Sequence, residues 1–284
     1  MTTAVDPQPI LVVGSTGKTG RRVLARLAER DIPVRHGSRQ ADPAFDWQDP
    51  ETWPPALQGV RAIYLTYAPD IALPGAVTAV RAFMGLAADA GVQHVVFLSG
   101  RGEDEAQQAE TVVQSSGIPW TILRCAWFAQ NFSENVFLGD IVKGEVILPA
   151  GKVGEPFVDA EDIADVAVAA LTEDGHVGRL YELTGPRLLT FAEAVQEIAA
   201  ATGRQISFQE IPAQAYRAAL ESAQLPPDLI WLIDYLFTTV LDGRNAYVAH
   251  GVQSALQRPP RDFRDYARAT AASGIWNTPA LEVQ

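Results

Sequence analysis

The stretch ILVVGSTGKTGRRVLARL, residues 10–27, decides the fold. A run of apolar β-forming residues, Ile10 to Val13, leads into Gly14, Gly17 and Gly20, and an apolar-periodic helix follows them. In such a unit the first glycine allows a tight turn, the second lets a pyrophosphate approach the backbone, and the third lets helix and strand pack closely. Three glycines alone also fit a βα turn that binds nothing. The strand before them and the helix after them favour a dinucleotide-binding loop.

Strands and helices alternate through the first half of the chain. The sequence predicts further strands at 32–38, 61–67, 94–99 and 120–124, and helices that include 76–90 and 103–116. This rhythm implies a parallel sheet with right-handed crossovers. We therefore expect an α/β protein, a Rossmann-type doubly wound parallel sheet with a smaller, mostly helical C-terminal substrate lobe.

The expected domains follow from where this rhythm changes. We expect an NAD(P)-binding Rossmann domain over 1–150 that also receives parts of 156–186 and 244–276, and a substrate-binding lobe over 187–243. Thr190 and Glu193 predict a capping box at a helix start. The helix predicted over 229–241 is apolar nearly all round, which indicates burial in the core, at a subunit contact or over a ligand.

Composition excludes several classes of function. The net charge of −12 over 284 residues argues against nucleic-acid binding and suits a cationic small molecule. Cys125 is the only cysteine and the four histidines are scattered, so we expect no disulfide and no metal. The sequence shows neither an apolar run of membrane-spanning length nor a signal-peptide pattern, and we expect a cytoplasmic monomer or homodimer without a membrane partner.

The residues after the second strand concern the choice of cofactor. NAD users tend to place Asp or Glu there, whereas NADP users place an Arg. This chain has no acid at that point but has Ser38 and Arg39, which can hydrogen-bond to and pair with a 2′-phosphate. We expect NADP(H) as the cofactor, and a merely solvated Arg39 is the alternative.

Several motifs together resemble the NmrA-like group of atypical short-chain dehydrogenases. They are GSTGKTG, the FDW segment with TW after it, YLTYAPD, and the element WF-x-x-N-F within SGIPWTILRCAWFAQNF. They look most like reductases of the ergot-alkaloid type (festuclavine and agroclavine dehydrogenases) and their bacterial relatives, and more distantly like NADPH-dependent quinone reductases. The group also contains a non-catalytic NADP-sensing regulator, so the resemblance leaves both an enzyme and a sensor open.

The resemblance implies a set of cofactor-binding residues. It implies that Gly14, Ser15, Thr16, Gly17, Lys18 and Thr19 line the pyrophosphate, that Ser38 and Arg39 bind the adenosine phosphate, that Asp46 and Trp47 lie at the adenine edge, that Thr66, Tyr67 and Ala68 pass under the cofactor, and that Ser99 and Gly100 lie near the nicotinamide. One departure concerns the loop after the strand at 120–124. Relatives often have Arg-Pro there, where this chain has Arg124-Cys125.

A missing pair of residues restricts the chemistry. Most short-chain dehydrogenases use a Tyr four residues before a Lys to donate a proton. The only lysines here are Lys18, Lys143 and Lys152, and none follows a tyrosine at that spacing. We therefore expect reduction of an acceptor that needs little protonation, such as an iminium, an activated C=C or a quinone. Sugar-nucleotide epimerisation is disfavoured because it relies on the same pair.

Candidate catalytic and substrate-binding residues are few. Tyr67 or Ser99 could donate a proton, and Cys125 has no visible activating base and is expected to be a buried core residue. Aromatic faces suit flat or cationic ligands. The expected substrate contacts are Trp127, Phe128, Asn131 and Phe132, with Trp231 and Tyr235 from the late helix, although aromatic residues at such spacing are more often core.

Overall fold

The computed structural model describes residues 8–134 and 136–277, and the chain forms two compact units. Unit 1 runs from the start of the described chain to Cys125 and includes Ala160–Leu183 and His250–Arg258. Unit 2 comprises Ala126–Asp159, Thr184–Ala249 and the chain from Pro259 to the end of the described residues. Each unit is therefore assembled from separate segments of sequence.

Unit 1 is built on a six-stranded parallel sheet. Its strands are β1 (Ile10–Val13), β2 (Val34–Gly37), β3 (Ala62–Leu65), β4 (His94–Gly100), β5 (Trp120–Cys125) and β7 (Arg179–Leu183), in the order β2-β1-β3-β4-β5-β7. This confirms the predicted Rossmann-type α/β fold. The chain adds β2 on one side of β1 and then returns to add β3 on the other. The carboxyl ends of β1 and β3 are therefore the topological switch point, where open α/β sheets bind ligands.

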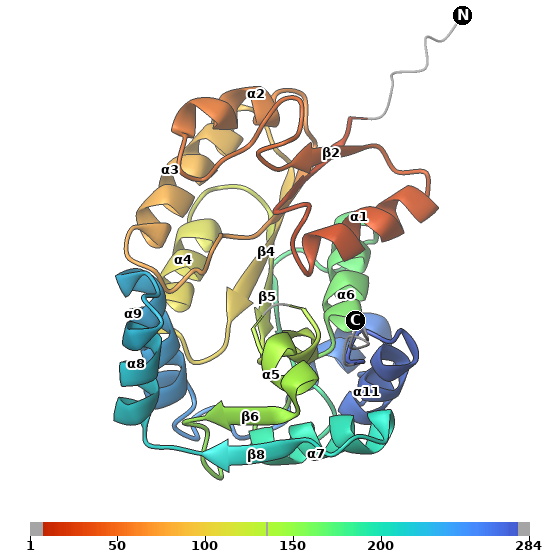
Figure 1. Ribbon diagram of the computed structural model, residues 1–284. Helices are drawn as coiled ribbons and strands as arrows, with labels where there is room; N and C mark the ends of the chain where they lie inside the picture. Colours follow the sequence, from red (N-terminus) through yellow and green to blue (C-terminus); the bar gives the residue numbers. More distant parts are fainter. Residues whose placement is uncertain (1–7, 135, 278–284) are drawn as a thin grey trace, which may run out of the picture. The chain divides into compact units, whose positions relative to one another are not determined.

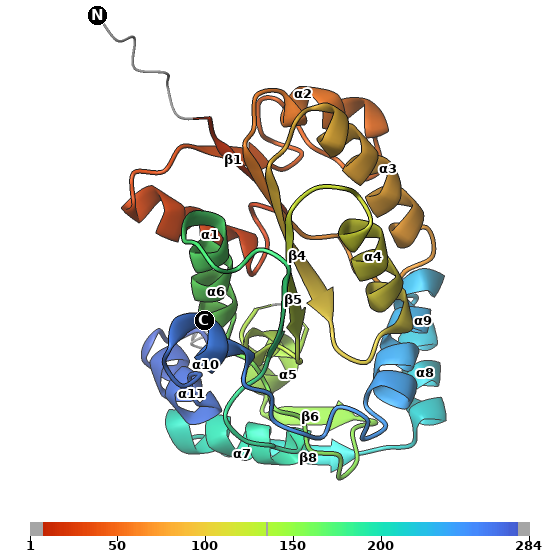
Figure 2. The ribbon, with the colours of Figure 1, turned by 180° about the vertical axis from the view of Figure 1, so that it is seen from behind.

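Helices cover both faces of this sheet (Figures 1 and 2). One face carries α1 (Gly20–Glu29) and α6 (Ala160–Thr172); the other carries α2 (Trp53–Leu57), α3 (Ala76–Asp89) and α4 (Asp104–Gln114). Arg22 Nε donates to Glu161 Oε1 at 2.6 Å and so ties α1 to α6. The short α10 (Gly251–Leu256) begins at a glycine whose Cα lies against the backbone of β7. A Cβ on Gly251 would stand 2.2 Å from the Glu182 carbonyl oxygen.

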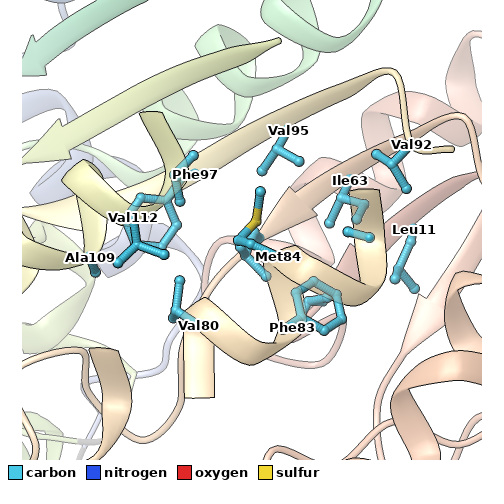
Figure 3. Packing of buried hydrophobic residues seen from close by; sticks show 14 of the residues in the cluster. Leu11, Ile63, Val80, Phe83, Met84, Val92, Val95, Phe97, Ala109 and Val112 are labelled. Atoms are coloured by element: carbon cyan, nitrogen blue, oxygen red, sulfur yellow. The ribbon is translucent and has the colours of Figure 1, made fainter. Parts of the chain in front are cut away.

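The core on the α3 side follows the twofold alternation of the strands (Figure 3). Val95 and Phe97 of β4 point toward this face together with Ile63 of β3, and all three are fully buried. They pack against Phe83 and Met84 of α3. Burial of a side chain of this size stabilises the fold by about 1.5–3 kcal/mol. The helices therefore hold the strand ends, and the loops that follow them, in fixed positions.

Unit 2 has a small parallel sheet and several helices. Its elements are β6 (Glu145–Leu148), β8 (Ser207–Glu210), a 3-10 turn (Ala129–Phe132), α5 (Leu138–Lys143), α7 (Phe191–Thr202), α8 (Ala213–Ser222), α9 (Pro227–Tyr235), a π-helical turn (Leu236–Val240) and α11 (Phe263–Ala272). The predicted capping box is confirmed: the Glu193 N–H donates to Thr190 Oγ1 at 3.1 Å, and the Thr190 N–H donates to Glu193 Oε2 at 2.7 Å.

The boundaries of the units differ from the expected domains in three places. Residues 126–150, expected in the nucleotide-binding domain, belong to unit 2, and so do residues 244–249 and the described chain from Pro259 onward. The physical reason is an aromatic core that these segments share with α7. Phe132 packs 5.6 Å from Phe263, and the Trp276 indole donates to the Phe132 carbonyl oxygen at 2.8 Å.

The helix predicted over 229–241 is not buried on every side. Ile230, Leu232 and Phe237 are buried, but Leu229 and Trp231 are exposed, and the α-helix gives way to the π-helical turn after Tyr235. No helix within the described part of the chain has the length and apolar character needed to cross a membrane.

Candidate dinucleotide site

The glycine loop after β1 forms a tight turn. Gly14 adopts φ +69°, a backbone conformation that favours glycine, and its N–H donates to the Gly37 carbonyl oxygen at 2.9 Å. The Gly17 N–H then donates back to the Gly14 carbonyl oxygen at 2.8 Å. A Cβ on Gly20 would stand only 2.2 Å from that same oxygen, so the start of α1 packs directly on the turn.

This loop fits the pyrophosphate of a dinucleotide. The Ser15 hydroxyl oxygen is buried and has no hydrogen-bond partner among the described residues, which leaves it free to bond a ligand. Thr16 and Gly17 are exposed, so a phosphate can reach their backbone. The N-terminus of the ten-residue α1 adds the positive end of the helix dipole.

The end of β2 presents the predicted adenosine-phosphate residues beside this loop. Gly37 lies so close to β1 that a Cβ would stand 2.8 Å from the Val12 carbonyl oxygen. The Ser38 carbonyl oxygen accepts from the Phe45 N–H at 2.9 Å and closes the following turn. Arg39 is exposed and makes no ion pair or hydrogen bond with the described residues. Its guanidinium is therefore available to an anion.

Thr66, at the end of β3, joins the two sides of the switch point. Its hydroxyl donates to the Val13 carbonyl oxygen at 3.1 Å, and its Oγ1 would stand 2.4 Å from a Cβ on Gly14. Its own carbonyl oxygen accepts from the Trp47 indole at 3.0 Å. The Trp47 ring is buried and packs 4.8 Å from the ring of half-buried Tyr67, while Asp46 Oδ1 accepts from the Gln48 N–H. Trp47 thus holds the Thr66–Tyr67 backbone in place.

Ser99, at the end of β4, binds an internal charge network. Its buried hydroxyl donates to Glu110 Oε1 at 2.6 Å, and Arg124 Nε donates to the same atom at 2.9 Å. Arg124 Nη1 also lies 3.3 Å from Glu182 Oε1. The proton of the Ser99 hydroxyl is therefore already used in the hydrogen bond to Glu110. The unusual Arg124-Cys125 pair lies within β5, where Arg124 clamps Glu110.

Two acids that the sequence did not single out lie at this edge of the sheet. A Cβ on Gly100 would stand 2.2 Å from Glu103 Oε1, so the Glu103 carboxyl packs directly on the Gly100 Cα. Burial, together with the nearby charge of Asp70, raises the pKa of Glu103 well above its usual range. Burial also raises the pKa of Asp70. In the sequence Glu103 looks like an ordinary acid at the start of a helix, and only its raised pKa next to a predicted nicotinamide residue distinguishes it.

Burial also affects the other candidate groups. It raises the pKa of the Tyr67 phenol and of the Cys125 thiol, which is a free and buried cysteine as expected. Within the described chain, no group of three or more His, Cys, Asp or Glu side chains could hold a metal ion.

The candidate substrate residues all lie in unit 2, and they differ in burial. Trp127 packs 5.2 Å from Phe191, and Phe132 is fully buried 6.0 Å from the same ring. Phe128 and Asn131 are half-buried beside them in sequence. On α9, Trp231 and Tyr235 stack with ring centroids 5.2 Å apart, and Trp231 is 39% exposed. Phe132 therefore contributes to the core of unit 2, whereas Trp231 offers an open face.

Comparison with known proteins agrees with this architecture. The model of a family described as NAD(P)H-binding matches residues 14–174. Prestalk A differentiation protein A of Dictyostelium discoideum is 30% identical and NAD(P)H azoreductase of Xenophilus azovorans is 31% identical; the alignments cover 92% and 93% of this chain and 92% and 98% of those proteins. Agroclavine dehydrogenase of Claviceps fusiformis is 29% identical, with 90% of this chain and 95% of that protein covered.

A solved structure shows the same fold. The NADPH-dependent quinone oxidoreductase of Escherichia coli, crystallised with NADPH, superposes with a TM-score of 0.74 at 22% identity over 92% of this chain and 99% of that one. The predicted resemblance to clavine dehydrogenases and quinone reductases is thereby confirmed. The chain belongs to the NAD(P)H-binding family, in which its relatives include NAD(P)H-dependent oxidoreductases.

Proposed function

We propose that this protein is an NADPH-dependent reductase that transfers a hydride to an electron-poor small molecule, an iminium, an activated C=C or a quinone. The observation that carries the proposal is the cradle at the switch point. Gly14, Gly17 and Gly20 let the turn, Thr66 and the start of α1 pack closely there. The buried Ser15 hydroxyl has no partner among the described residues. Gly14, Ser15, Thr16, Gly17, Lys18 and Thr19 are the proposed pyrophosphate contacts.

NADPH is favoured over NADH by the residue that follows β2. A 2′-phosphate carries extra negative charge, and a planar guanidinium can bind it with two parallel hydrogen bonds. Arg39 is exposed and has no other partner among the described residues, and Ser38 precedes it in the same turn. We assign both to the adenosine phosphate and Asp46 to the adenine edge.

The class of acceptor follows from the scarcity of proton donors in this chain. Bound NADPH supplies a hydride, and the protein has to orient the acceptor and accommodate the charge that develops. The sequence has no Tyr-x-x-x-Lys pair, and burial moves the pKa of Tyr67 up, away from the range of a useful acid at neutral pH. An acceptor that already delocalises charge therefore fits best. The names of two similar proteins, an azoreductase and a quinone oxidoreductase, point to conjugated acceptors as well.

Unit 2 supplies the proposed substrate contacts. Trp127, Phe128 and Asn131 are half-buried, and the Trp231–Tyr235 stack has one exposed ring, so these side chains retain surface for a flat or cationic ligand. Phe132 supports them from within the core.

The test is a cofactor-oxidation assay with the purified full-length chain. NADPH or NADH is mixed with an iminium, an enone, an azo dye, a quinone and a triarylmethyl cation, and absorbance at the reduced nicotinamide band is followed. We expect turnover of at least one acceptor, with NADPH preferred. Tight NADPH binding by calorimetry without oxidation by any acceptor would contradict the enzyme and support an NADP-sensing regulator instead.

A further inference from the structure

A pair of carboxyl groups lies at the carboxyl ends of β3 and β4. Glu103 follows β4 and precedes α4, and its carboxyl occupies the space that a side chain at Gly100 would fill. The residue is half-buried, and its Oε2 is closed to solvent without a hydrogen-bond partner among the described residues. Asp70 comes from the loop after β3, and its charge acts on Glu103. A polar atom buried in this way costs stability unless a ligand or a proton satisfies it.

The two carboxyl groups lie close to where the nicotinamide of a bound dinucleotide is expected. A dinucleotide lies across the switch point, with one mononucleotide half on each side. If Ser38 and Arg39, after β2, bind the adenosine half, the nicotinamide half lies over the ends of β3 and β4. Gly100 ends β4, so the Glu103 carboxyl stands next to the expected place of the reacting ring.

The surroundings of the two carboxyl groups favour the protonated form of Glu103. The groups whose charge acts on Glu103 are Asp70 and Glu105, and Glu103 in turn acts on the Cys125 thiol. The nearby Arg101 has its Nε 3.8 Å from Glu182 Oε2. Asp70 Oδ1 accepts the Ala72 N–H at 2.9 Å, which favours its charged form. Burial and the negative charge of Asp70 raise the pKa of Glu103, which favours the protonated form of Glu103.

We propose that Glu103 is the proton donor of the reduction and that Asp70 is a positioning residue that keeps Glu103 in its acid form. This inference rests on the proposed reductase function and replaces Tyr67 and Ser99 as acids. The Ser99 hydroxyl is committed to Glu110, and the pKa of Tyr67 is shifted away from neutrality.

The atoms balance for a neutral conjugated acceptor. For a quinone, the hydride from the reduced cofactor brings both electrons, and the Glu103 O–H bond breaks to protonate the oxygen that gains negative charge. The products are the hydroquinone, the oxidised cofactor and a carboxylate that solvent protonates again. For a cationic acceptor, hydride addition alone gives a neutral product and needs no proton. The two acceptor types therefore separate a proton donor from a structural residue.

The experiment compares Glu103→Gln with the wild-type chain on two acceptors, a naphthoquinone and a triarylmethyl cation. Loss of a general acid lowers kcat by about 10²-fold or more. We expect that loss with the quinone and less than a threefold change with the cation. Equal losses with both acceptors, or no loss with either, would overturn the proposal. Asp104→Asn is the matched control, because this exposed acid begins the same helix.

The pH profile is a second readout that does not depend on the cation. Wild-type quinone reduction should fall as the pH rises through the pKa of Glu103, and Glu103→Gln should lose this dependence. Asp70→Asn removes the neighbouring negative charge, so the fall should begin at lower pH. If the pH profile of Asp70→Asn equals that of the wild type, Asp70 does not position Glu103. If quinone reduction by Glu103→Gln still falls as the pH rises, a group other than Glu103 donates the proton. Absence of any wild-type turnover contradicts the proposed function itself.

Discussion

The Trp47 indole donates a hydrogen bond to the Thr66 carbonyl oxygen at 3.0 Å, across 19 positions of sequence. Thr66 in turn donates to the Val13 carbonyl oxygen and lies against Gly14. The FDW segment therefore supports the backbone at the end of β3, next to the glycine loop. A structural role for Trp47 follows from these contacts, whether or not the adjacent Asp46 binds the adenine.

Trp47→Phe should weaken both stability and nucleotide binding. Removing the indole N–H leaves the partly buried Thr66 carbonyl oxygen without its partner, which costs about 1–3 kcal/mol. Urea denaturation should show this loss, and fluorescence titration should show weaker NADPH binding. Trp120→Phe is the control, because the Trp120 indole makes no hydrogen bond to the described residues. Equal NADPH affinity in Trp47→Phe and the wild type would contradict the supporting role.

Gly20→Ala should disrupt the glycine loop. The new Cβ would meet the Gly14 carbonyl oxygen at 2.2 Å, and backbone on both sides has to shift. We expect a stability loss of several kcal/mol, at the upper end for single substitutions, and no measurable NADPH binding. Gly85→Ala in α3 is the matched control, since its Cβ meets nothing within 4 Å. That variant should be more stable by about 0.5–1 kcal/mol.

Arg39→Ala should change the cofactor preference. A hydrogen-bonded charge pair with the 2′-phosphate contributes about 1.5–3 kcal/mol, or roughly 10- to 100-fold in affinity. The Kd for NADPH should rise by this factor while the Kd for NADH stays the same, as measured by calorimetry. Arg81→Ala, an exposed arginine of α3, should leave both constants unchanged. Undiminished NADPH affinity in Arg39→Ala would show that its guanidinium is only solvated.

Glu110→Ala should destabilise unit 1. Glu110 accepts from both Ser99 and Arg124, and its side chain is only 4% exposed. Removing one partner of a buried ion pair costs about 3–5 kcal/mol. Because Arg124 keeps its ion pair with Glu182, we expect a loss at the lower end of this range. Thermal unfolding measures the loss. Gln108→Ala, at an exposed position of the same helix, should change stability by less than about 0.5 kcal/mol.

The Asp262 carboxylate should make part of the stability depend on acid pH. The hydrogen-bonded Arg187 guanidinium lowers the pKa of Asp262, so this contribution is complete above the unfolded-state pKa of about 4 and is lost as the pH falls below it. The Arg187 side chain is 34% exposed and the Asp262 side chain 29%, so solvent screening limits the contribution of this pair to stability to about 1 kcal/mol. Asp262→Asn should be less stable than the wild type at pH 7, and the difference should shrink as the pH falls through the lowered pKa of Asp262. If the difference in stability does not change with pH, it arises from the loss of the Asp262 cap of α11 and not from the charge pair with Arg187.

The local elements could be predicted because their causes lie close together in the sequence. The glycine spacing after Ile10–Val13 determines a turn into a helix, and the capping box at Thr190 is complete within four residues. The parallel sheet followed from the alternation of strands and helices. Each of these depends on backbone geometry and hydrophobic periodicity over short distances.

Only the tertiary structure decided which loops share one edge of the sheet and which segments share one core. Glu103, Asp70 and Gly100 come together because parallel strands place their carboxyl ends side by side, and the strand order is not a local property. For the same reason Phe132 and Trp276, 144 positions apart, belong to one unit. The sequence by itself determined a dinucleotide-type loop after β1. The burial that sets the pKa of Glu103, and with it the proposed acid, arises only when distant segments pack together.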